Sequence, residues 1–426
     1  MVLGAAETEP MDNQTDPSRC ILIVSFLEPW SIGPGQGAPS LYETLAGYAR
    51  AGWSVDYVTF WKRSLLGVAH ERSVEIDIPG VTVHRFSIPR WRWLPANLQA
   101  KLDRLLLFPL FALPTTLRML RERRPSIFYA YEASAIITAS LSRLFRRKRE
   151  QTIHRIQGVS VLGESHRKRW FMLRKAESLL SLRARADAYI MTNDGTRGDE
   201  VWQYWNSAVT ADRLLHIRNG ISPELFQAKS DRGAALARFR LDPAHLHLLM
   251  LSRLDPIKRV DRGLRAMAGL RDSHPQVRLL IVGDGEQRQE LEALAQSLGI
   301  GDRVRFLGAL DRSGVAGALQ CADIFLSLYD FSNCGNPLFE ALLCELPIIT
   351  LDNGATGTVI THGDNGLLLP VGDGDRLDDA LRTLVEDSDA RDRLRLGARS
   401  WAQANLVSWV DRMNREVEWV VRKTAC

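Results

Sequence analysis

Short apolar runs alternate with longer amphipathic segments along almost the whole chain. The first run, CILIVSF at residues 20–26, is continuous and does not alternate with polar residues. Such runs are typical of strands that are buried on both faces of a parallel sheet. Parallel strands must be joined by crossover connections, which are usually helices. The alternation therefore predicts a doubly wound α/β architecture.

The alternation forms two series, and two domains are also what a length of 426 residues favours. In the first series we expect strands at 20–26, 55–60, 81–86, 127–131, 152–156 and 188–192, and helices at 98–123, 134–145, 167–185 and 198–205. In the second we expect strands at 247–251, 277–282, 304–307, 324–328 and 348–351, and helices at 260–270, 286–298, 313–319, 337–344 and 375–387. Ser40 and Glu43 form an S-x-x-E capping box, which predicts one further helix up to about residue 51. Together the two series predict two sheets with a cleft between them.

Composition limits the class of protein. The chain is 45% hydrophobic and 25% charged, which is typical of globular domains, and it has no apolar run of 18 residues that could span a membrane. Residues 1–18 are polar and lack the features of a signal peptide, so we expect a disordered leader. The five cysteines are scattered, without metal-ligand spacing, as in a reduced cytoplasmic protein. The sequence therefore predicts a cytoplasmic protein without a bound metal.

Positive charge is concentrated in the first half of the chain. Residues 1–222 carry 30 Lys and Arg against 21 Asp and Glu, whereas residues 223–426 carry 25 against 29. This asymmetry indicates an anionic partner for the N-terminal half. Nucleic acid fits poorly, because the aromatic residues lie in apolar runs and do not form an exposed basic and aromatic stripe.

The segment SRLDPIKR at residues 252–259 follows an expected strand of the second series. The carboxyl ends of strands in open α/β sheets face the ligand crevice, so Arg253 and Lys258 are candidates for binding a diphosphate. Arg offers a planar fork of donors and Lys a mobile point charge. By spacing alone, a solvated basic loop explains the segment equally well.

A second candidate segment covers residues 329–340, again just after an apolar strand. Gly335-Asn336-Pro337 predicts a loop that enters a helix with proline at its first position. Free backbone N–H groups at such a helix end bind phosphate oxygens. Glu340, about one turn later, could accept hydrogen bonds from ribose hydroxyls, or could merely complement the helix dipole.

Two glycine-rich loops are weaker signals. Gly283-Asp284-Gly285 follows the expected strand 277–282, but position 288 is Arg, so the G-x-G-x-x-G pattern of dinucleotide-binding oxidoreductases is absent. The loop at residues 33–37, which contains Gly35 and Gly37, also lacks that spacing. Either loop could let the backbone approach a substrate closely, or could be only a tight turn.

The order and spacing of these segments resemble the family-4 retaining glycosyltransferases. The matching elements are the first glycine-rich loop with Leu45-Ala46, Asn219-Gly220-Ile221 with Phe226, Ser252-Arg253-Leu254 with Lys258, Gly283-Asp284-Gly285, the run from Asp302 to Gly308, Ala322-Asp323, and Glu340-Ala341 with Pro347. The resemblance implies the GT-B fold, in which two Rossmann-like doubly wound domains face a central cleft. It implies an N-terminal acceptor-binding domain over residues 19–222 and a C-terminal nucleotide-sugar domain over residues 223–407. It also implies that the amphipathic segment 408–426 returns to the first domain.

The resemblance implies roles for individual residues. Arg253 and Lys258 would neutralise the diphosphate as it leaves, and Glu340 would bind the donor ribose. The donor sugar and phosphates would contact Gly335, Asn336, Pro337 and Leu338. The nucleotide base would lie near Leu310, and the remaining donor contacts would come from Gly35, Gly37, Gly283 and Asp284.

Two positions depart from the family pattern. The first glutamate of the family's E-x7-E motif falls at Ser332. Asp330 could replace it from two residues away, or Ser332 and Asn333 could bind the sugar as neutral groups. Alternatively, the missing glutamate indicates an inactive homologue of the family.

The second departure is in the N-terminal half. Where the family often has a histidine beside the reacting sugar, this chain has Gln157, for which we predict a catalytic, substrate-facing role. His154 and Glu132 are candidates for acceptor binding, although a histidine within a strand is equally well explained as a structural one.

The implied reaction transfers a hexosyl unit from a nucleoside diphosphate sugar, with retention of configuration and without a metal or other cofactor. UDP-sugar is favoured over GDP-sugar as the co-substrate. The acceptor would be a glycan, a lipid-linked or a small molecule. The residues Trp91 to Leu94 and the helices expected at 98–123 and 167–185 combine bulky apolar with basic residues, which suits an anionic membrane surface, although ordinary amphipathic helices show the same pattern. The alternatives are a degenerate GT-B protein that acts as a binding partner, and a sugar-nucleotide epimerase of the same fold.

Overall fold

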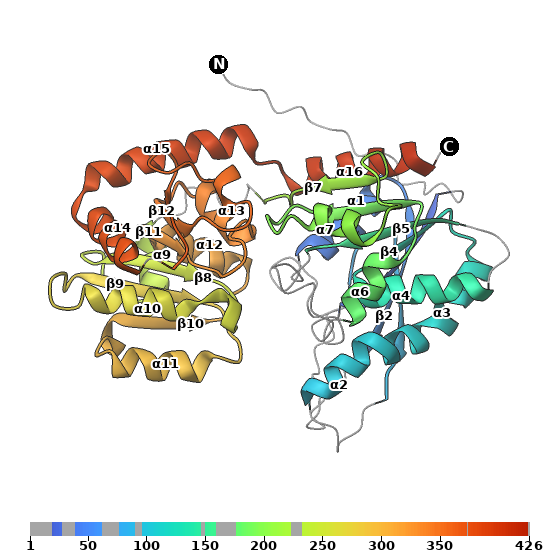
Figure 1. Ribbon diagram of the computed structural model, residues 1–426, viewed down its shortest axis with the longest axis horizontal. Helices are drawn as coiled ribbons and strands as arrows, with labels where there is room; N and C mark the ends of the chain where they lie inside the picture. The colour runs from blue at the N-terminus through green and yellow to red at the C-terminus, as the bar shows by residue number, and fades with distance from the viewer. Residues whose placement is uncertain are drawn as a thin grey trace.

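The computed structural model describes residues 19–27, 39–61, 76–89, 96–145, 150–158, 176–222, 232–372 and 374–424. Two lobes lie side by side, each built around one parallel sheet with helices on its faces (Figure 1). The fold predicted from the alternation of strands and helices is confirmed.

The N-terminal lobe contains a seven-stranded sheet in the order β3-β2-β1-β4-β5-β6-β7. Its strands are β1 (Cys20–Ser25), β2 (Ser54–Trp61), β3 (Val81–Ser87), β4 (Ile127–Tyr131), β5 (Gln151–Ile156), β6 (Ala188–Thr192) and β7 (Leu214–Ile217). Its helices are α1 (Pro39–Arg50), α2 (Ala96–Leu102), α3 (Phe108–Glu122), α4 (Ala133–Ser142), α6 (Ala176–Arg183) and α7 (Gly198–Trp205), with the π-helix η2 (Asp103–Leu107) and the 3-10 helix η3 (Arg143–Phe145).

The C-terminal lobe contains a six-stranded sheet in the order β10-β9-β8-β11-β12-β13. Its strands are β8 (Leu246–Leu251), β9 (Val277–Val282), β10 (Val304–Gly308), β11 (Ile324–Ser327), β12 (Ile348–Leu351) and β13 (Leu367–Leu369). Its α-helices are α9 (Arg232–Arg238), α10 (Val260–Gly269), α11 (Arg288–Ser297), α12 (Arg312–Cys321), α13 (Asn336–Leu343), α14 (Gly374–Glu386) and α15 (Ser388–Asn405), and its 3-10 turns are η5 (Pro256–Lys258), η6 (Gly301–Arg303) and η7 (Thr356–Thr358). The last helix, α16 (Trp409–Thr424), follows α15.

Both sheets bury both faces, as the continuous apolar strands predict. In β1, Leu22 and Val24 belong to one core cluster, whereas Ile21 and Ile23 belong to the cluster on the opposite face. This division follows because successive side chains of a strand point to opposite faces. The same division occurs in β8 of the C-terminal lobe. None of the described helices is both long enough and apolar enough to cross a bilayer.

The helix α16 connects the lobes. It follows α15, which runs along the C-terminal lobe, and packs against α1 of the N-terminal lobe (Figure 1). Ile221 and Ser408 form a parallel bridge, and the Trp409 N–H donates to the Ile221 carbonyl at 3.0 Å. Two chain segments therefore pass between the lobes side by side.

A buried ionic network fixes α16 to the N-terminal sheet. Arg155 on β5 lies 3.3 Å from Glu416, Arg412 also contacts Glu416, and all three side chains are fully buried. The Tyr129 hydroxyl donates to the same carboxylate at 2.8 Å. Burial opposes ionisation of Glu416, but the two guanidinium groups outweigh it and lower the pKa of the carboxyl.

Several local expectations differ from the structure. The single helix expected at residues 98–123 is interrupted by η2, directly before Pro109, whose ring nitrogen cannot donate to the preceding turn. Ser40 is not a helix cap: α1 already includes Pro39, and the Ser40 hydroxyl accepts a hydrogen bond from Tyr131 at 3.1 Å. The short strands β7 and β13 and the helices α9 and α15 were not expected. Of the helix expected at 167–185, only the part from residue 176 lies within the described residues.

Candidate active site

A cavity of about 540 Å³ lies between the two lobes. It is lined by Ser40, Gln157, Gly158, Thr192, Asn193, Asp194, Thr196, Asn219, Arg253, Asp255, Ile257, Lys258, Tyr329, Phe331, Ser332, Cys334, Gly335, Asn336, Pro337 and Phe339. Most of these residues follow the carboxyl end of a strand, namely β5 or β6 in one lobe and β8 or β11 in the other. Open α/β sheets bind ligands near the point where the strand order reverses. In the C-terminal sheet β8 and β11 flank this point, and in the N-terminal sheet β5 and β6 lie one and two strands beyond β4, which flanks it.

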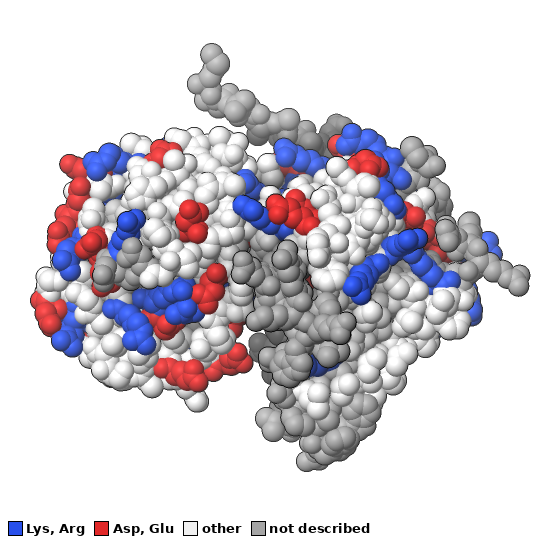
Figure 2. Space-filling view, viewed as in Figure 1, with Lys and Arg blue, Asp and Glu red and all other residues white. Residues whose placement is uncertain are grey.

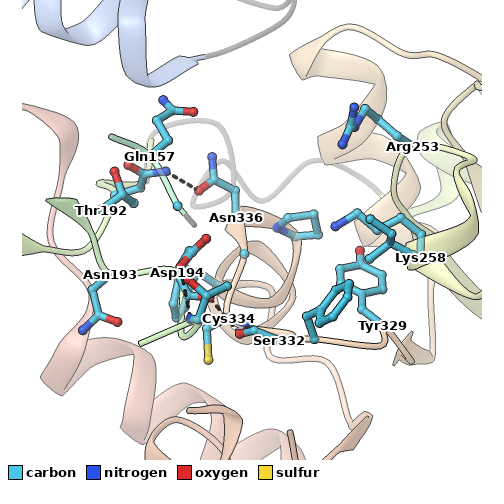
Figure 3. Close-up of a pocket in the computed structure, with 18 of the residues that line it drawn as sticks. Gln157, Thr192, Asn193, Asp194, Arg253, Lys258, Tyr329, Ser332, Cys334 and Asn336 are labelled. Carbon is cyan, nitrogen blue, oxygen red and sulfur yellow. Dashed lines mark hydrogen bonds between the residues drawn. The ribbon is translucent and has the colours of Figure 1, made fainter. Parts of the chain in front are cut away.

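Lys258 and Arg253 approach the cavity from the loop after β8 (Figure 3). The Lys258 ammonium lies 3.9 Å from the centre of the Tyr329 ring, and the Tyr329 hydroxyl is fixed by the Leu251 carbonyl at 2.9 Å. Burial lowers the pKa of Lys258, while the charge of Asp255 opposes that change. The Arg253 side chain is 81% exposed and pairs with Asp255 at 3.1 Å. Both cations can therefore reach an anion in the cavity.

The N-terminal end of α13 forms the opposite wall. The helix begins at Asn336, one residue before Pro337, and Gly335 is its extended N-cap residue. The Asn219 amide, from the segment between the lobes, donates to the Asn336 side chain at 3.1 Å. No side chain caps this helix end. Pro337 has no N–H, and the N–H groups of Leu338 and Phe339 point to the Gly335 carbonyl, so the Asn336 N–H and the positive end of the helix dipole are what this end offers to a negatively charged ligand.

The loop after β6 crosses to the C-terminal lobe. Ser332 donates to the Asp194 carbonyl at 2.7 Å, and the Ala355 N–H donates to the Gly195 carbonyl at 2.8 Å. Gly195 has a φ of +76°, and a Cβ atom at this position would lie 2.4 Å from the Ser332 hydroxyl. A glycine is therefore needed where the lobes touch at the floor of the cavity.

Gln157 faces the cavity from the N-terminal lobe. Its side-chain amide contacts the hydroxyl groups of Ser40 and Tyr131, and its backbone N–H donates to the Glu132 carboxylate at 3.0 Å. Glu132 has a φ of +74°, in a region that side chains rarely adopt, and burial raises its pKa to about 7. Strain of this kind persists only where the surrounding structure fixes the residue, as the hydrogen bond to Gln157 does here.

Two family profiles match the chain. One, described as a glycosyl transferase 4-like domain, matches residues 37–220, and the other, described as glycosyl transferases group 1, matches residues 237–401. The chain belongs to the group 1 glycosyltransferases.

Individual relatives of this glycosyltransferase agree with the profiles. A phosphatidyl-myo-inositol mannosyltransferase of Mycobacterium leprae is 34% identical over 148 residues, which are 34% of this chain and 39% of the relative. The chain therefore spans about two fifths of the length of that relative.

Solved structures share the fold over nearly the whole chain. Sucrose-phosphate synthase from Thermosynechococcus elongatus superposes with a TM-score of 0.75 at 21% identity, over 96% of this chain and 99% of its own. Anabaena HepE in complex with UDP-glucose gives 0.71 at 20% identity, over 95% and 99%. The fold is GT-B.

Of the residues predicted to act in this glycosyltransferase, seven line the cavity: Arg253, Lys258, Gln157, Ser332, Gly335, Asn336 and Pro337. Gly35 and Gly37 lie outside the described residues. Leu310, directly before the N-cap of α12, and Glu340, on α13, lie beyond the cavity lining. Burial raises the pKa of Glu340 to about 7, and the guanidinium of Arg312 opposes that rise.

Four other residues predicted to contact the donor do not line this cavity. Asn333 is fully buried and braces its own loop, accepting from the Ser327 hydroxyl at 2.8 Å and donating to Asn353 at 2.9 Å. Leu338 is fully buried in the core. Gly283 and Asp284 do not line the cavity; a Cβ atom at Gly283 would lie 1.8 Å from the Ser252 carbonyl, so this turn supports the loop that carries Arg253.

Three further predictions concern one histidine, His154, and two acidic residues, Asp330 and Glu132. His154 is fully buried against the Tyr189 ring, and burial lowers its pKa to about 3, so it is a neutral core residue and not an acceptor ligand. Asp330 cannot replace the missing glutamate, because its carboxylate pairs with Arg259 at 3.1 Å and Arg262 at 2.9 Å. Glu132 lies behind Gln157 and does not line the cavity, although its hydrogen bond positions the Gln157 backbone.

Sequence reasoning missed the loop after β6, with Asn193, Asp194 and Thr196. The sequence does contain a pattern that predicts these residues: a strand is expected at 188–192, and polar residues follow it directly. Applying the rule on strand ends to the N-terminal sheet as well would have found them.

Proposed function

We propose that this chain is a retaining glycosyltransferase that transfers a hexosyl unit from a nucleoside diphosphate sugar, with UDP favoured over GDP. One observation carries the proposal: Lys258, Arg253 and the uncapped N-terminal end of α13 converge on a single cavity between the lobes. A donor diphosphate is the ligand that best satisfies two cations and the positive end of a helix dipole. The shared fold of HepE, solved with UDP-glucose, supports the choice of donor.

In the proposed reaction, cleavage of the anomeric C–O bond builds negative charge on the leaving diphosphate. Lys258, Arg253 and the positive end of α13 stabilise that charge. Arg253 exchanges Asp255 for a phosphate oxygen, which its exposure allows. The leaving phosphate takes the proton of the acceptor hydroxyl on the same face, so this route needs neither a metal nor a protein nucleophile.

A panel of UDP-, GDP- and ADP-sugars tests the proposal. We expect the purified protein to bind one donor class and to release free sugar slowly in the absence of an acceptor. Donor binding without any release of sugar would favour a degenerate binding partner. That alternative arises because Ser332 stands where the family has a glutamate. Interconversion of the sugar without its release would favour an epimerase.

We further propose an anionic membrane surface, at the inner face of the cytoplasmic membrane, as the place where a lipid-linked or glycan acceptor is met. The helices on one flank of the N-terminal lobe expose large apolar side chains: Leu98, Leu106, Leu110, Phe111, Leu144, Phe145 and Leu180. The surface around α3 is largely without charge, whereas both signs are interspersed on the C-terminal lobe (Figure 2). Residues 91–94, expected to contribute, lie outside the described residues.

Vesicle flotation tests this surface. We expect the protein to float with vesicles that contain anionic lipid at low salt, and less so with neutral vesicles. A protein that stays unbound with anionic vesicles at low salt would exclude the membrane surface, without affecting the proposed donor chemistry.

A further inference from the structure

Two acidic side chains line the cavity, Asp194 and Asp255. Asp255 is occupied by its ion pair with Arg253. Asp194 belongs to the N-terminal lobe, and its carboxylate points to the middle of the cavity, toward Asn336 (Figure 3). Among the described residues, no cation lies within ion-pair distance of it. A carboxylate that can accept hydrogen bonds therefore faces the cavity from the lobe opposite the one that carries Lys258.

Both lobes fix the position of Asp194. Its Oδ1 accepts hydrogen bonds from the Thr196 N–H at 3.1 Å and from the Thr196 hydroxyl at 2.6 Å. Its backbone carbonyl accepts from Ser332 of the C-terminal lobe. A carboxylate held in this way needs little reordering when a ligand arrives.

The second oxygen of Asp194 remains available. Oδ2 lies beside Gly158, where a Cβ atom would approach it to 2.0 Å, so only glycine leaves room for it. No described residue donates a hydrogen bond to Oδ2. A carboxylate has several acceptor positions, so Oδ2 can accept a hydrogen bond from a ligand while Oδ1 keeps its bonds to Thr196.

The other polar side chains near position 332 already have partners within the protein. The Ser332 hydroxyl donates to Asp194, Asn333 is buried within its loop, and Asp330 is paired with two arginines. Among the residues that the structure describes, Asp194 is therefore the acidic group at this end of the cavity that can still accept a hydrogen bond from a ligand.

Electrostatics agree with the geometry. Burial raises the pKa of Asp194, and the hydrogen bonds from Thr196 oppose that rise. The charge of Asp194 in turn opposes the lowering of the Lys258 pKa, so the two groups act across the same space. A donor with its diphosphate at Lys258 would have its sugar in the space between them.

We propose that Asp194 binds a hydroxyl group of the transferred sugar and determines which sugar is accepted. The contact is charge-assisted, from a sugar O–H to Oδ2, and it comes from the N-terminal lobe. Ser332 acts as a positioning residue, because its hydroxyl donates to the Asp194 carbonyl and already accepts from the Cys334 N–H. This inference rests on the proposed donor chemistry and specifies the part of the cavity that meets the sugar.

The experiment compares Asp194→Asn with Asp330→Asn, each measured with UDP and with the donor that the wild type turns over fastest. Asn keeps an oxygen for Thr196 but loses the charge. We expect Asp194→Asn to bind UDP as the wild type does, within about twofold, which also shows that it is folded. Its kcat/KM for the donor should fall by roughly 10- to 100-fold, the usual effect of losing a hydrogen bond to a charged group. Asp330→Asn, the rival acid, should retain kcat/KM within about threefold.

A series of deoxy-sugar donors identifies the contact. The donor that lacks the hydroxyl bound by Asp194 should be used equally well by the wild type and by Asp194→Asn. The proposal is overturned if the variant keeps the wild-type kcat/KM, if UDP binding falls as much as kcat/KM does, or if every deoxy donor loses the same factor. A wild type that binds no nucleotide sugar would instead overturn the proposed function itself.

Discussion

At the scale of single residues, position within the fold decides what a side chain can do. His154 and Gln157 are three residues apart at the end of β5, yet one is sealed in the core and the other faces the cavity. Asn333 and Ser332 are adjacent, and only Ser332 reaches the cavity. These differences follow from the alternation of side chains at a strand end and from the turn of one loop.

Replacing Lys258 or Arg253 by Ala tests the cations of the cavity. We expect turnover of the best donor to fall by at least about 100-fold in each variant, because charge that develops on the diphosphate loses a fixed partner. Steady-state kinetics would measure this. Arg382→Ala, on the exposed side of α14, is the matched control and should be unchanged. Near-normal activity in both cavity variants would show that the donor lies elsewhere.

At the scale of elements, α16 is part of the N-terminal lobe although it ends the chain. Glu416 neutralises Arg155 from β5 and Arg412 from its own helix, and no water reaches any of the three. Gln157, which lines the cavity, lies two residues beyond Arg155. The ionic network with α16 therefore fixes β5, the strand that leads into this part of the cavity wall.

Glu416→Ala would leave two buried guanidinium groups without their carboxylate. Removing one partner of a buried ion pair costs about 3–5 kcal/mol. For a lobe of this size that corresponds to a fall of roughly 10 °C in the thermal unfolding midpoint, measurable by circular dichroism. Glu418→Ala, on the exposed face of the same helix, should leave the midpoint unchanged. Equal midpoints for the two variants would contradict the importance of the network.

At the scale of the whole molecule, the lobes meet where two loops cross. The loop after β6 lies against residues 332–334 and 354–355, and Glu43 approaches Arg312 at 3.8 Å farther along the cleft. The lobes therefore meet beside the cavity, and any change in their approach changes the site.

Gly195→Ala would place a Cβ atom 2.4 Å from the Ser332 hydroxyl and 2.8 Å from the Cys334 Cβ, forcing the loops apart. We expect kcat to fall by about tenfold or more, because small misplacements of reacting groups are costly, while UDP affinity changes little. Gly363→Ala is the matched control: its φ is +81°, close to the +76° of Gly195, but a Cβ atom there meets nothing within 4 Å. If both variants lose the same activity, backbone strain and not the contact between lobes is the cause.

The sequence by itself determined the two sheets and the segments that carry the cations. Continuous apolar strands that alternate with amphipathic segments are typical of parallel sheets, and the ends of such strands carry the ligand groups. Arg253, Lys258 and the start of α13 therefore followed from local pattern. These features depend on residues that are neighbours in the chain.

Only the tertiary structure decided which polar residues face the cavity. Asp194 meets Ser332 across 138 positions of sequence, and Glu416 meets Arg155 across 261. The hydrophobic periodicity of the sequence cannot predict such contacts, because each depends on how two sheets and the returning helix α16 are placed relative to one another. Burial then removes His154 and Asn333 from the site, and ion pairing removes Asp330, while the crossing of two loops brings Asp194 into it.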